Sequence, residues 1–463
     1  MMRRHILRAT SRLAVISVAA AGLALLGATV VGVPAVLAMV CPTGTVGVSG
    51  TTVTTTFGFT GAEQCISIPN GVTQFTVAAI GGAGGGAING AGGEGAEVSA
   101  TFTTVAAPAS LFVEVGGTGV APAGVTGGAS QFNGGAGGGT TETGGNGGAG
   151  GGGASDVRTC SISDVSCPAL GSGSDPRLIV AGGGGGGSVE AIGGAGGAGV
   201  SSTCNVGSPG AVGFFGFGPG PGGGGCSSAS PGGAGGVGSD TTGGNGGAGG
   251  GGTGGNNAGD CPAGGGGGGG YFGGGGGGGG CFNDSGGGGS SFVADGASGV
   301  SMTTTTNGPS VVITYQQPAT TTTVGSSVNP ANPGQSVTYT ATVSPSPNPS
   351  GGTVDFADGG TTIPGCGSVV LNGATATCTV SYATTGTHDI TATYSGDVNY
   401  QASPASAVLA ESVVAIAIPT TGATSDGGWA GNALGLAAIL AGMLLIGRGW
   451  SMFVRPSGFR THG

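Results

Sequence analysis

The sequence predicts an all-β protein in which a glycine-rich β sandwich with polyglycine insertions precedes a second β sandwich and a single C-terminal transmembrane helix. Three observations lead to this fold class. Glycine supplies 119 of the 463 residues and charged residues only 6%, far from the composition of an ordinary globular domain. Apolar residues alternate with polar ones on both sides of the glycine tracts. The last segment is apolar and ends in basic residues.

The charge balance excludes one class of partner. The chain has no Lys, and seven of its nine Arg lie in the two terminal segments. Between residues 39 and 428 two Arg face all nineteen Asp and Glu, and 2 − 19 gives a net charge of −17. Nucleic-acid binding needs Lys and Arg to displace counterions from phosphates. We therefore expect no nucleic-acid partner.

Residues 1–38 have the order of a signal peptide. Four Arg, the last of them Arg12, precede an apolar stretch from Leu13 to Ala38 that ends in small residues. We expect cleavage after Ala38. The stretch is also long enough for an uncleaved N-terminal membrane anchor, so this alternative stays open. Arg3-Arg4 resembles a twin-arginine signal, and the export route stays open as well.

Ten cysteines follow the leader, and their even number predicts disulfides in an exported chain. They are Cys41, Cys65, Cys160, Cys167, Cys204, Cys226, Cys261, Cys281, Cys366 and Cys378. No CxxC pair occurs, and His388 is the only His outside the terminal segments, which argues against a zinc site. We expect no metal and no cofactor. Sequential pairing is our hypothesis, although many other connectivities are consistent with the sequence.

The glycine-rich β domain is expected over residues 39–317. Strands are predicted where apolar residues alternate: Gln74–Ile80, Ala96–Thr104, Ser110–Val115, Arg177–Ala181 and Ser310–Tyr315. Because such segments flank the glycine tracts, we expect the two ends of this region to meet in one sandwich, with the tracts as insertions.

Two structures remain open for the tracts themselves. They can be flexible linkers, or threefold helices of the polyproline II type that pack side by side because nothing projects from the backbone. In packed helices, neighbours would satisfy each other's N–H and C=O groups. Collagen is excluded, since runs such as Gly182–Gly187 break a G-X-Y period.

The order of the glycine segments resembles a known family. Gly150–Arg158 is followed by Arg177–Ala181 and six glycines, then by Gly264–Phe272 and eight glycines, then by Gly286–Val293. Over residues 70–316 this order is similar to the glycine-rich domain family of bacterial surface proteins and of anaplastic lymphoma kinase-type receptors. The resemblance implies a jelly-roll-like β sandwich with packed glycine helices. No kinase domain is present, so no signalling role follows.

A second β domain is expected over residues 319–410. Alternating sets such as Val337, Tyr339, Ala341 and Val343 each predict one buried strand face. Asn372-Gly373 predicts a two-residue hairpin turn, because both positions tolerate positive φ. Counting outward from this turn places Cys366 within one residue of the position opposite Cys378. We therefore expect a cross-strand disulfide, with a bulge absorbing the offset.

Three segments of this domain resemble a bacterial Ig-like repeat. They are Asn332–Thr338, Gly352–Phe356 and Tyr394–Tyr400. The resemblance implies a seven-strand sandwich that serves as a spacer or adhesive module.

Residues 411–463 have the three-part order of an envelope anchor. Ile418-Pro419-Thr420-Thr421-Gly422 precedes an apolar stretch at 430–446 and a basic tail, which suits one transmembrane helix with a cytoplasmic end. The order resembles an LPxTG sorting signal. The resemblance implies that sortase cuts between Thr421 and Gly422 and joins Thr421 to peptidoglycan. Ile418 departs from the usual Leu, and a plain membrane anchor is the alternative.

Little in the sequence indicates catalysis. A triad would need His388, which alternates with Ile390 on a predicted strand and suits a structural role there. Asp156 and Arg158 could instead form an ion pair with Asp175 or Arg177 that pins the glycine insert to the sandwich.

The aromatics Tyr271, Phe272, Phe214, Phe215 and Phe217 lie among glycines. We expect them to cap packed glycine helices rather than to form an exposed patch.

The sequence therefore favours a non-catalytic, exported structural or adhesive protein held at the cell wall or plasma membrane. Its expected partners are peptidoglycan or the membrane, through the anchor, and sortase as the processing enzyme. The alternative is a surface binding module for a glycan or protein ligand, held by a plain membrane anchor. The sequence does not identify the extracellular ligand.

Overall fold

The computed structural model describes residues 42–104, 109–189, 191–197, 204–211, 233–234, 241–258, 260–280, 284–348 and 351–415. Every regular element in these ranges is a β-strand. Within them, no helix is long or apolar enough to span a membrane. The expected signal peptide, the sorting motif and the span at 430–446 lie outside these ranges.

Two six-stranded sheets form the first sandwich. The first has the order β1 (Thr45–Ser49), β2 (Thr52–Gly58), β14 (Ser310–Gln316), β4 (Gln74–Ile80), β5 (Gly95–Thr103) and β13 (Ser298–Thr305). The second has the order β3 (Gln64–Ile68), β6 (Ala109–Glu114), β7 (Ser155–Arg158), β8 (Arg177–Ala181), β12 (Ser291–Val293) and β9 (Cys204–Asn205). A further pair joins β10 (Ala248–Gly249) and β11 (Gly270–Phe272).

The alternating residues make the core between these two sheets. Val77, Val98, Val113, Val157 and Ile313 are all fully buried there. Strand β14, which follows the last glycine tract, pairs with β2 on one side and β4 on the other. The expectation that the two ends of the region meet in one sandwich is therefore confirmed.

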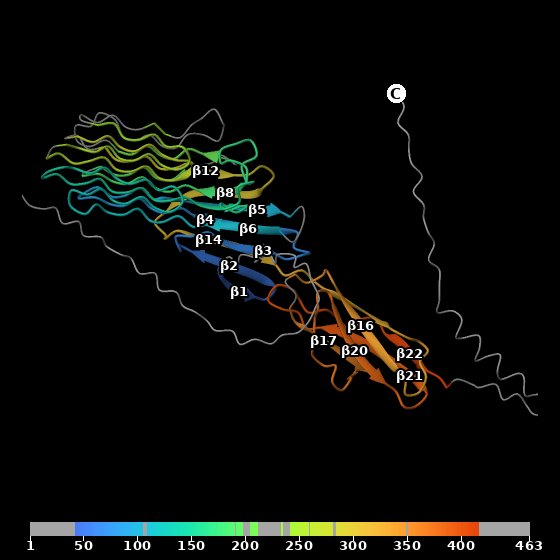
Figure 1. Ribbon diagram of the computed structural model, residues 1–463. Helices are drawn as coiled ribbons and strands as arrows, with labels where there is room; N and C mark the ends of the chain where they lie inside the picture. Colours follow the sequence, from blue (N-terminus) through green and yellow to red (C-terminus); the bar gives the residue numbers. More distant parts are fainter. Residues whose placement is uncertain are drawn as a thin grey trace, which may run out of the picture.

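The glycine tracts leave the ends of the strands and pack against one another (Figure 1). The tract Gly182–Gly187 shows the pattern. From Gly183 onward, its N–H groups donate to Gly269, Gly82, Gly194, Gly266 and Gly85 in turn, at 2.7 to 2.9 Å. The partner tract thus recurs at every third residue, which is the repeat of a polyproline II helix.

The carbonyls of the same tract follow the same repeat. Those of Gly183 to Gly187 accept from Gly289, Gly152, Gly93, Gly286 and Ala149 in turn. A tract without side chains therefore satisfies its backbone through neighbours on every side. Of the two structures that the sequence leaves open for the tracts, the described residues adopt the packed one.

Close packing explains why the tracts are glycine. A Cβ atom on Gly184 would lie 2.0 Å from the carbonyl oxygen of Gly93, and one on Gly185 would lie 2.0 Å from that of Gly286. Both contacts are with backbone, which cannot rotate away. Any larger residue would force two tracts apart.

The second sandwich packs a three-stranded sheet on a five-stranded one. The first has the order β15 (Thr321–Ser326), β16 (Ser336–Ser344) and β20 (Thr375–Ser381). The second has the order β18 (Thr361–Thr362), β17 (Thr353–Asp358), β21 (Gly386–Tyr394) and β22 (Leu409–Val413), with β19 (Val369–Val370) also paired to β17. Tyr339, Phe356, Ile390 and Tyr394 are fully buried between the sheets.

The expected pairing of Cys366 with Cys378 is confirmed, but the place of this disulfide in the fold differs from the expected one. Cys366 and Cys378 are bonded, with Cα atoms 5.7 Å apart. The turn closes between Asn372 and Thr375, and β19 before it pairs with β17 instead of β20. The bond therefore joins the two sheets of the sandwich, and the expectation of a cross-strand link within one hairpin is wrong.

The other cysteines are partly described. Cys160 and Cys167 form the sequential pair that we expect, and Cys65 and Cys261 are also disulfide-bonded. Cys204 lies in β9. Cys41, Cys226 and Cys281 lie outside the described residues.

The two domains lie end to end (Figure 1), and the segment between them is held by side-chain hydrogen bonds. Gln317 donates from Nε2 to the carbonyls of Asp397 and Val398, at 3.0 Å each. Gln401 donates in return to the carbonyl of Gln317 at 2.6 Å. We call these two glutamines the interdomain clamp.

Two further contacts support the clamp. Tyr315 at the end of β14 donates its hydroxyl to Asn399 at 2.8 Å. Asn70 donates to the carbonyl of Ser346 at 3.0 Å. Both join a residue of the first sandwich to a loop of the second, so the linker is not a free hinge.

Candidate functional site

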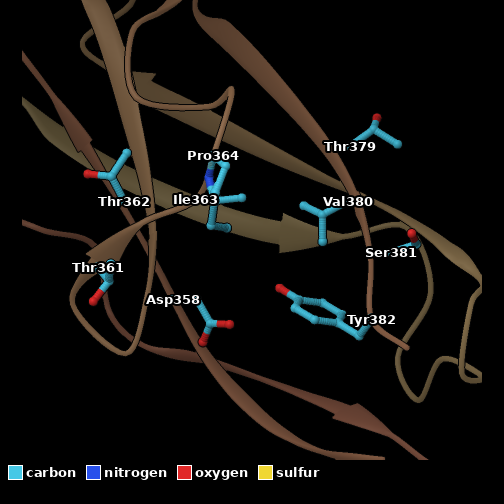
Figure 2. Close-up of a pocket in the computed structure, with 9 residues that line it drawn as sticks. All are labelled: Asp358, Thr361, Thr362, Ile363, Pro364, Thr379, Val380, Ser381 and Tyr382. Carbon is cyan, nitrogen blue, oxygen red and sulfur yellow. The ribbon is translucent and has the colours of Figure 1, made fainter. Parts of the chain in front are cut away.

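A groove of about 440 Å³ opens at one edge of the second sandwich. It lies between the β17–β18 hairpin of one sheet and the end of β20 in the other. Its walls are Asp358, Thr361, Thr362, Ile363, Pro364, Thr379, Val380, Ser381 and Tyr382 (Figure 2). The inter-sheet disulfide begins two residues after Pro364 and crosses to β20.

Asp358 and Tyr382 meet at one end of the groove (Figure 2), and His388 holds them together. The Nδ1 atom of His388 lies 2.6 Å from Oδ2 of Asp358. The imidazole also stacks on the ring of Tyr382, with centroids 3.6 Å apart. Since one carboxylate oxygen of Asp358 is engaged in this way, its Oδ1 atom is the one that can serve a ligand.

Behind Tyr382 lies a buried polar row. The hydroxyl of Tyr339 donates to that of Tyr382 at 3.1 Å, and burial raises the pKa of both phenols. Both therefore stay protonated at neutral pH. The carboxylate of Glu411 is 0% exposed and has no hydrogen-bond partner. It lies opposite His388 in the β21–β22 ladder.

His388 itself occupies the place that the alternation predicts. It lies on β21, two residues before the buried Ile390. Its ring is 23% exposed, and its Nδ1 atom is paired with Asp358. The predicted place of His388 on a strand is confirmed, and its side chain has a hydrogen-bond partner.

The sequence reasoning missed Asp358 and Tyr382 as members of a site. Asp358-Gly359-Gly360 is a recognisable turn signal, and both glycines have positive φ. That signal predicts the β17–β18 hairpin. It does not predict that Tyr382, at the end of β20, faces the hairpin across the sandwich edge.

The buried charges of the first domain form pairs different from those expected. Arg158 pairs with Asp156 at 2.6 Å, and Arg177 with Asp175 at 2.6 Å. Each pair lies within its own segment, because the two side chains sit two residues apart on one face. The expected pairing of Asp156 or Arg158 with the 175–177 segment is therefore wrong.

Both arginine pairs nevertheless reach the glycine tracts. Arg177 donates to the carbonyls of Gly270 and Tyr271, at 3.2 and 3.3 Å. Asp156 accepts from the side chain of Asn133 at 2.8 Å. The charges thus hold the glycine insert on the sandwich, which is the role that the sequence predicts for them.

Aromatic residues cover the outer face of the second sheet. Tyr271 and Phe272 are 5% and 6% exposed, and Tyr271 stacks on Phe292 with centroids 4.2 Å apart. These two residues are therefore buried and form no exposed patch, and they pack on the sheet with Val180 and Phe292. Phe214, Phe215 and Phe217 lie outside the described residues.

The remaining expected sites are of two kinds. In the described part of the chain, no group of three or more His, Cys, Asp or Glu could hold a metal ion. The motif Ile418-Pro419-Thr420-Thr421-Gly422 falls in residues that the structure does not describe.

The fold defines a class of protein. It is an all-β chain in which the interdomain clamp joins a sandwich with packed glycine tracts to an Ig-like sandwich. Residues 322–413 match the family model of the bacterial Ig-like domain (group 3). A comparison of the chain with curated proteins finds no match.

Proposed function

We propose that the chain is an exported, non-catalytic protein of a bacterial cell envelope with a structural or adhesive role. The observation that carries this proposal is the bacterial Ig-like domain at 322–413, with a disulfide between its sheets. Disulfides persist in oxidising surroundings outside the cytoplasm. Ig-like sandwiches of this class suit a spacer that presents another domain.

In this proposal the glycine-rich domain is the part displayed. It resembles, in the order of its glycine segments, the glycine-rich domains of bacterial surface proteins. The interdomain clamp of Gln317 and Gln401 supports a fixed presentation, because the displayed domain cannot swing freely on its spacer.

The C-terminal segment supplies the attachment. We propose that Ile418–Gly422 acts as a sorting motif, that sortase cuts after Thr421, and that peptidoglycan is the covalent partner. A span at 430–446 that stays in the plasma membrane is the second arrangement, with the same orientation of the folded part.

Cell fractionation tests the attachment. We expect muramidase, which cuts the wall glycan, to release the wild-type chain. Thr421→Ala should shift the chain to the fraction released by detergent alone, while Thr420→Ala, one residue earlier, should leave it in the wall. Release of the wild type by detergent alone would favour the plain anchor.

Thiol trapping in intact cells tests export itself. We expect all cysteines of the mature chain to resist an alkylating reagent until a reductant is added. A soluble cytoplasmic pool with an intact leader and reactive thiols would contradict the proposal.

A further inference from the structure

We propose that the groove at Asp358 and Tyr382 binds a neutral oligosaccharide of the cell's own envelope. This inference rests on the proposed function and adds to it a ligand class and an orientation. It comes from the hydrogen-bonding groups left free in the groove, from its charge and from its position on the domain.

The free polar groups suit a hydroxyl-rich ligand. His388 pairs with Oδ2 of Asp358. The other carboxylate oxygen, Oδ1, can therefore accept a hydrogen bond from a sugar hydroxyl. Tyr382 accepts from Tyr339, which leaves its own proton to donate. The exposed hydroxyls of Thr361 and Ser381 can do both. The hairpin and the end of β20 therefore both offer hydrogen-bonding groups to a ligand in the groove.

The apolar part of the lining suits the C–H faces of a sugar ring. Ile363, Pro364 and Val380 supply it. Pockets for small molecules combine such an apolar lining with a few placed polar groups, and the volume of about 440 Å³ lies in their usual range.

Charge restricts the ligand further. No Lys or Arg occurs between residues 319 and 415, and the one histidine of the domain, His388, already pairs with Asp358. The groove therefore has no Lys or Arg to pair with a sulfate, phosphate or carboxylate. Asp358 lies in the groove itself, and the buried carboxylate of Glu411 lies nearby on β22. An anionic ligand would bring another charge to an already negative edge. A neutral saccharide meets no such penalty.

An added peptide strand fits less well. It would have to pair with the free edge of β20, yet only Thr379, Val380 and Ser381 of that strand line the groove. Three residues are fewer than the five or six of a usual strand. The disulfide at Cys378 and the neighbouring β19 lie beyond them.

The position of the groove points to the cell's own envelope. Ser381 pairs with Ser336 at the start of β16, whereas the other end of β16, Ser344, leads to the loop that contacts the first domain. The groove therefore lies at the far end of the Ig-like domain. Strand β22 leaves at the same end, since Val413 pairs with Gly386. The chain runs on from there toward its proposed anchor, so the groove faces the cell.

Titration of the full mature chain with defined sugars tests the proposal. The neutral probes are chitotriose and maltotriose, and the anionic one is a hyaluronan tetrasaccharide, each followed by ligand-observed NMR at pH 7. We expect at least one neutral probe to bind and hyaluronan not to bind. Asp358→Asn and Tyr382→Phe should each weaken the neutral sugar by about tenfold or more, because each removes one hydrogen-bonding group.

Asp389→Asn is the matched control, because Asp389 is an exposed acid on β21 that does not line the groove. It should leave affinity unchanged. Thr361 is an exposed residue of the groove, so Thr361→Ala should weaken sugar binding without destabilising the fold. Thermal unfolding of each variant separates a loss of binding from a loss of folding. The proposal is overturned if neither neutral sugar binds, if hyaluronan binds as tightly, or if the control weakens binding equally. Wall attachment without sugar binding would overturn this inference and leave the proposed function standing.

Discussion

Arg177 shows how single residues join the glycine tracts to the sandwich. Its side chain is 1% exposed, pairs with Asp175, and lies 4.4 Å from the centre of the Tyr271 ring. Burial alone would raise the pKa of Asp175, but hydrogen bonds and the charge of Arg177 outweigh burial and hold this pKa below its usual value. The pair is therefore charged in the folded chain.

Arg177→Lys should destabilise the glycine-rich domain by about 2–4 kcal/mol. Lysine keeps the charge, but its single ammonium group cannot replace the planar guanidinium, which donates to Asp175 and to two tract carbonyls at once. The substitution therefore leaves buried acceptors without partners. Urea denaturation at neutral pH measures the loss. A change below about 0.5 kcal/mol, the usual size for an exposed site, would show that the pair does not hold the tracts.

Glu114 makes the stability of the fold depend on pH in the opposite sense, because its pKa is raised whereas that of Asp175 is lowered. It is 1% exposed with no hydrogen-bond partner. Desolvation, and after it the charge of Asp156, raise the pKa of Glu114 to about 8. The folded chain thus keeps a proton that the unfolded chain releases near pH 4.5. The stability from this group is complete below that pH and falls as pH rises toward 8.

Glu114→Gln should remove this loss. The amide has the same shape and never ionises, so the variant should lose less stability than the wild type between pH 5 and 8. The difference can reach about 4 kcal/mol, since each pKa unit corresponds to about 1.4 kcal/mol. Thermal unfolding at both pH values measures it. Glu94→Gln, at an acid outside the buried core, should retain the wild-type slope, and a parallel slope in Glu114→Gln would contradict the assignment.

At the scale of elements, the glycine tracts replace side-chain packing by hydrogen bonds between neighbouring backbones. Their stability depends on contact distance, because each tract touches others on several sides. At many of the glycines, such as Gly184, a backbone carbonyl oxygen lies where a Cβ atom would be, whereas at others, such as Gly250, that space is open. The tolerance of a glycine to substitution should therefore follow the distance from the position that a Cβ atom would occupy to its nearest neighbour.

Gly184→Ala and Gly250→Ala test this rule within the same packed tracts. The first would place a Cβ atom 2.0 Å from the Gly93 oxygen, while the second has nothing within 4 Å. We expect Gly184→Ala to cost about 3 kcal/mol or more by overpacking, and Gly250→Ala to change stability by less than about 1 kcal/mol. Chemical denaturation of both variants gives the comparison, and equal losses would refute the rule.

The sequence predicted the strands better than it predicted the tracts and the groove. Val77 and Ala79 lie two residues apart on one face of β4, so this strand could be located from its own pattern. Gly184 is flanked by identical residues, so no local signal distinguishes a packed helix from a linker. Only its neighbours in space, such as Gly93, determine the structure.

The groove was missed for a related reason. Asp358 and Tyr382 come from different sheets, and no spacing along the chain relates them. The disulfide shows the same limit, since the pairing of Cys366 with Cys378 was expected but its crossing between sheets was not. That crossing depends on the pairing of β19 with β17. This pairing is set by the tertiary structure and leaves no local signal in the sequence.

At the scale of the whole molecule, the clamp makes two domains behave as one arm. Gln317 donates to the carbonyls of Asp397 and Val398, and Gln401 donates to the carbonyl of Gln317. Tyr315 and Asn399 add a further contact. Linkers that lack such contacts leave domains free to reorient. The two domains should therefore unfold cooperatively.

Replacing both Gln317 and Gln401 by Ala should uncouple the domains. We expect the wild type to unfold in one calorimetric transition and the double variant in two. Small-angle scattering should show a broader distribution of distances in the variant. Gln335→Ala is the control, because Gln335 bonds only within its own loop, to Asn332. Two transitions already in the wild type would contradict the clamp.

The burial of the two arginines has one more consequence. Between residues 42 and 415 the chain has no lysine, and its only arginines are Arg158 and Arg177, 6% and 2% exposed. Trypsin-like proteases must take a basic side chain into their specificity pocket before they cut. The folded arm offers them none, so the burial that lets these residues hold the glycine tracts in place also protects the arm from such proteases.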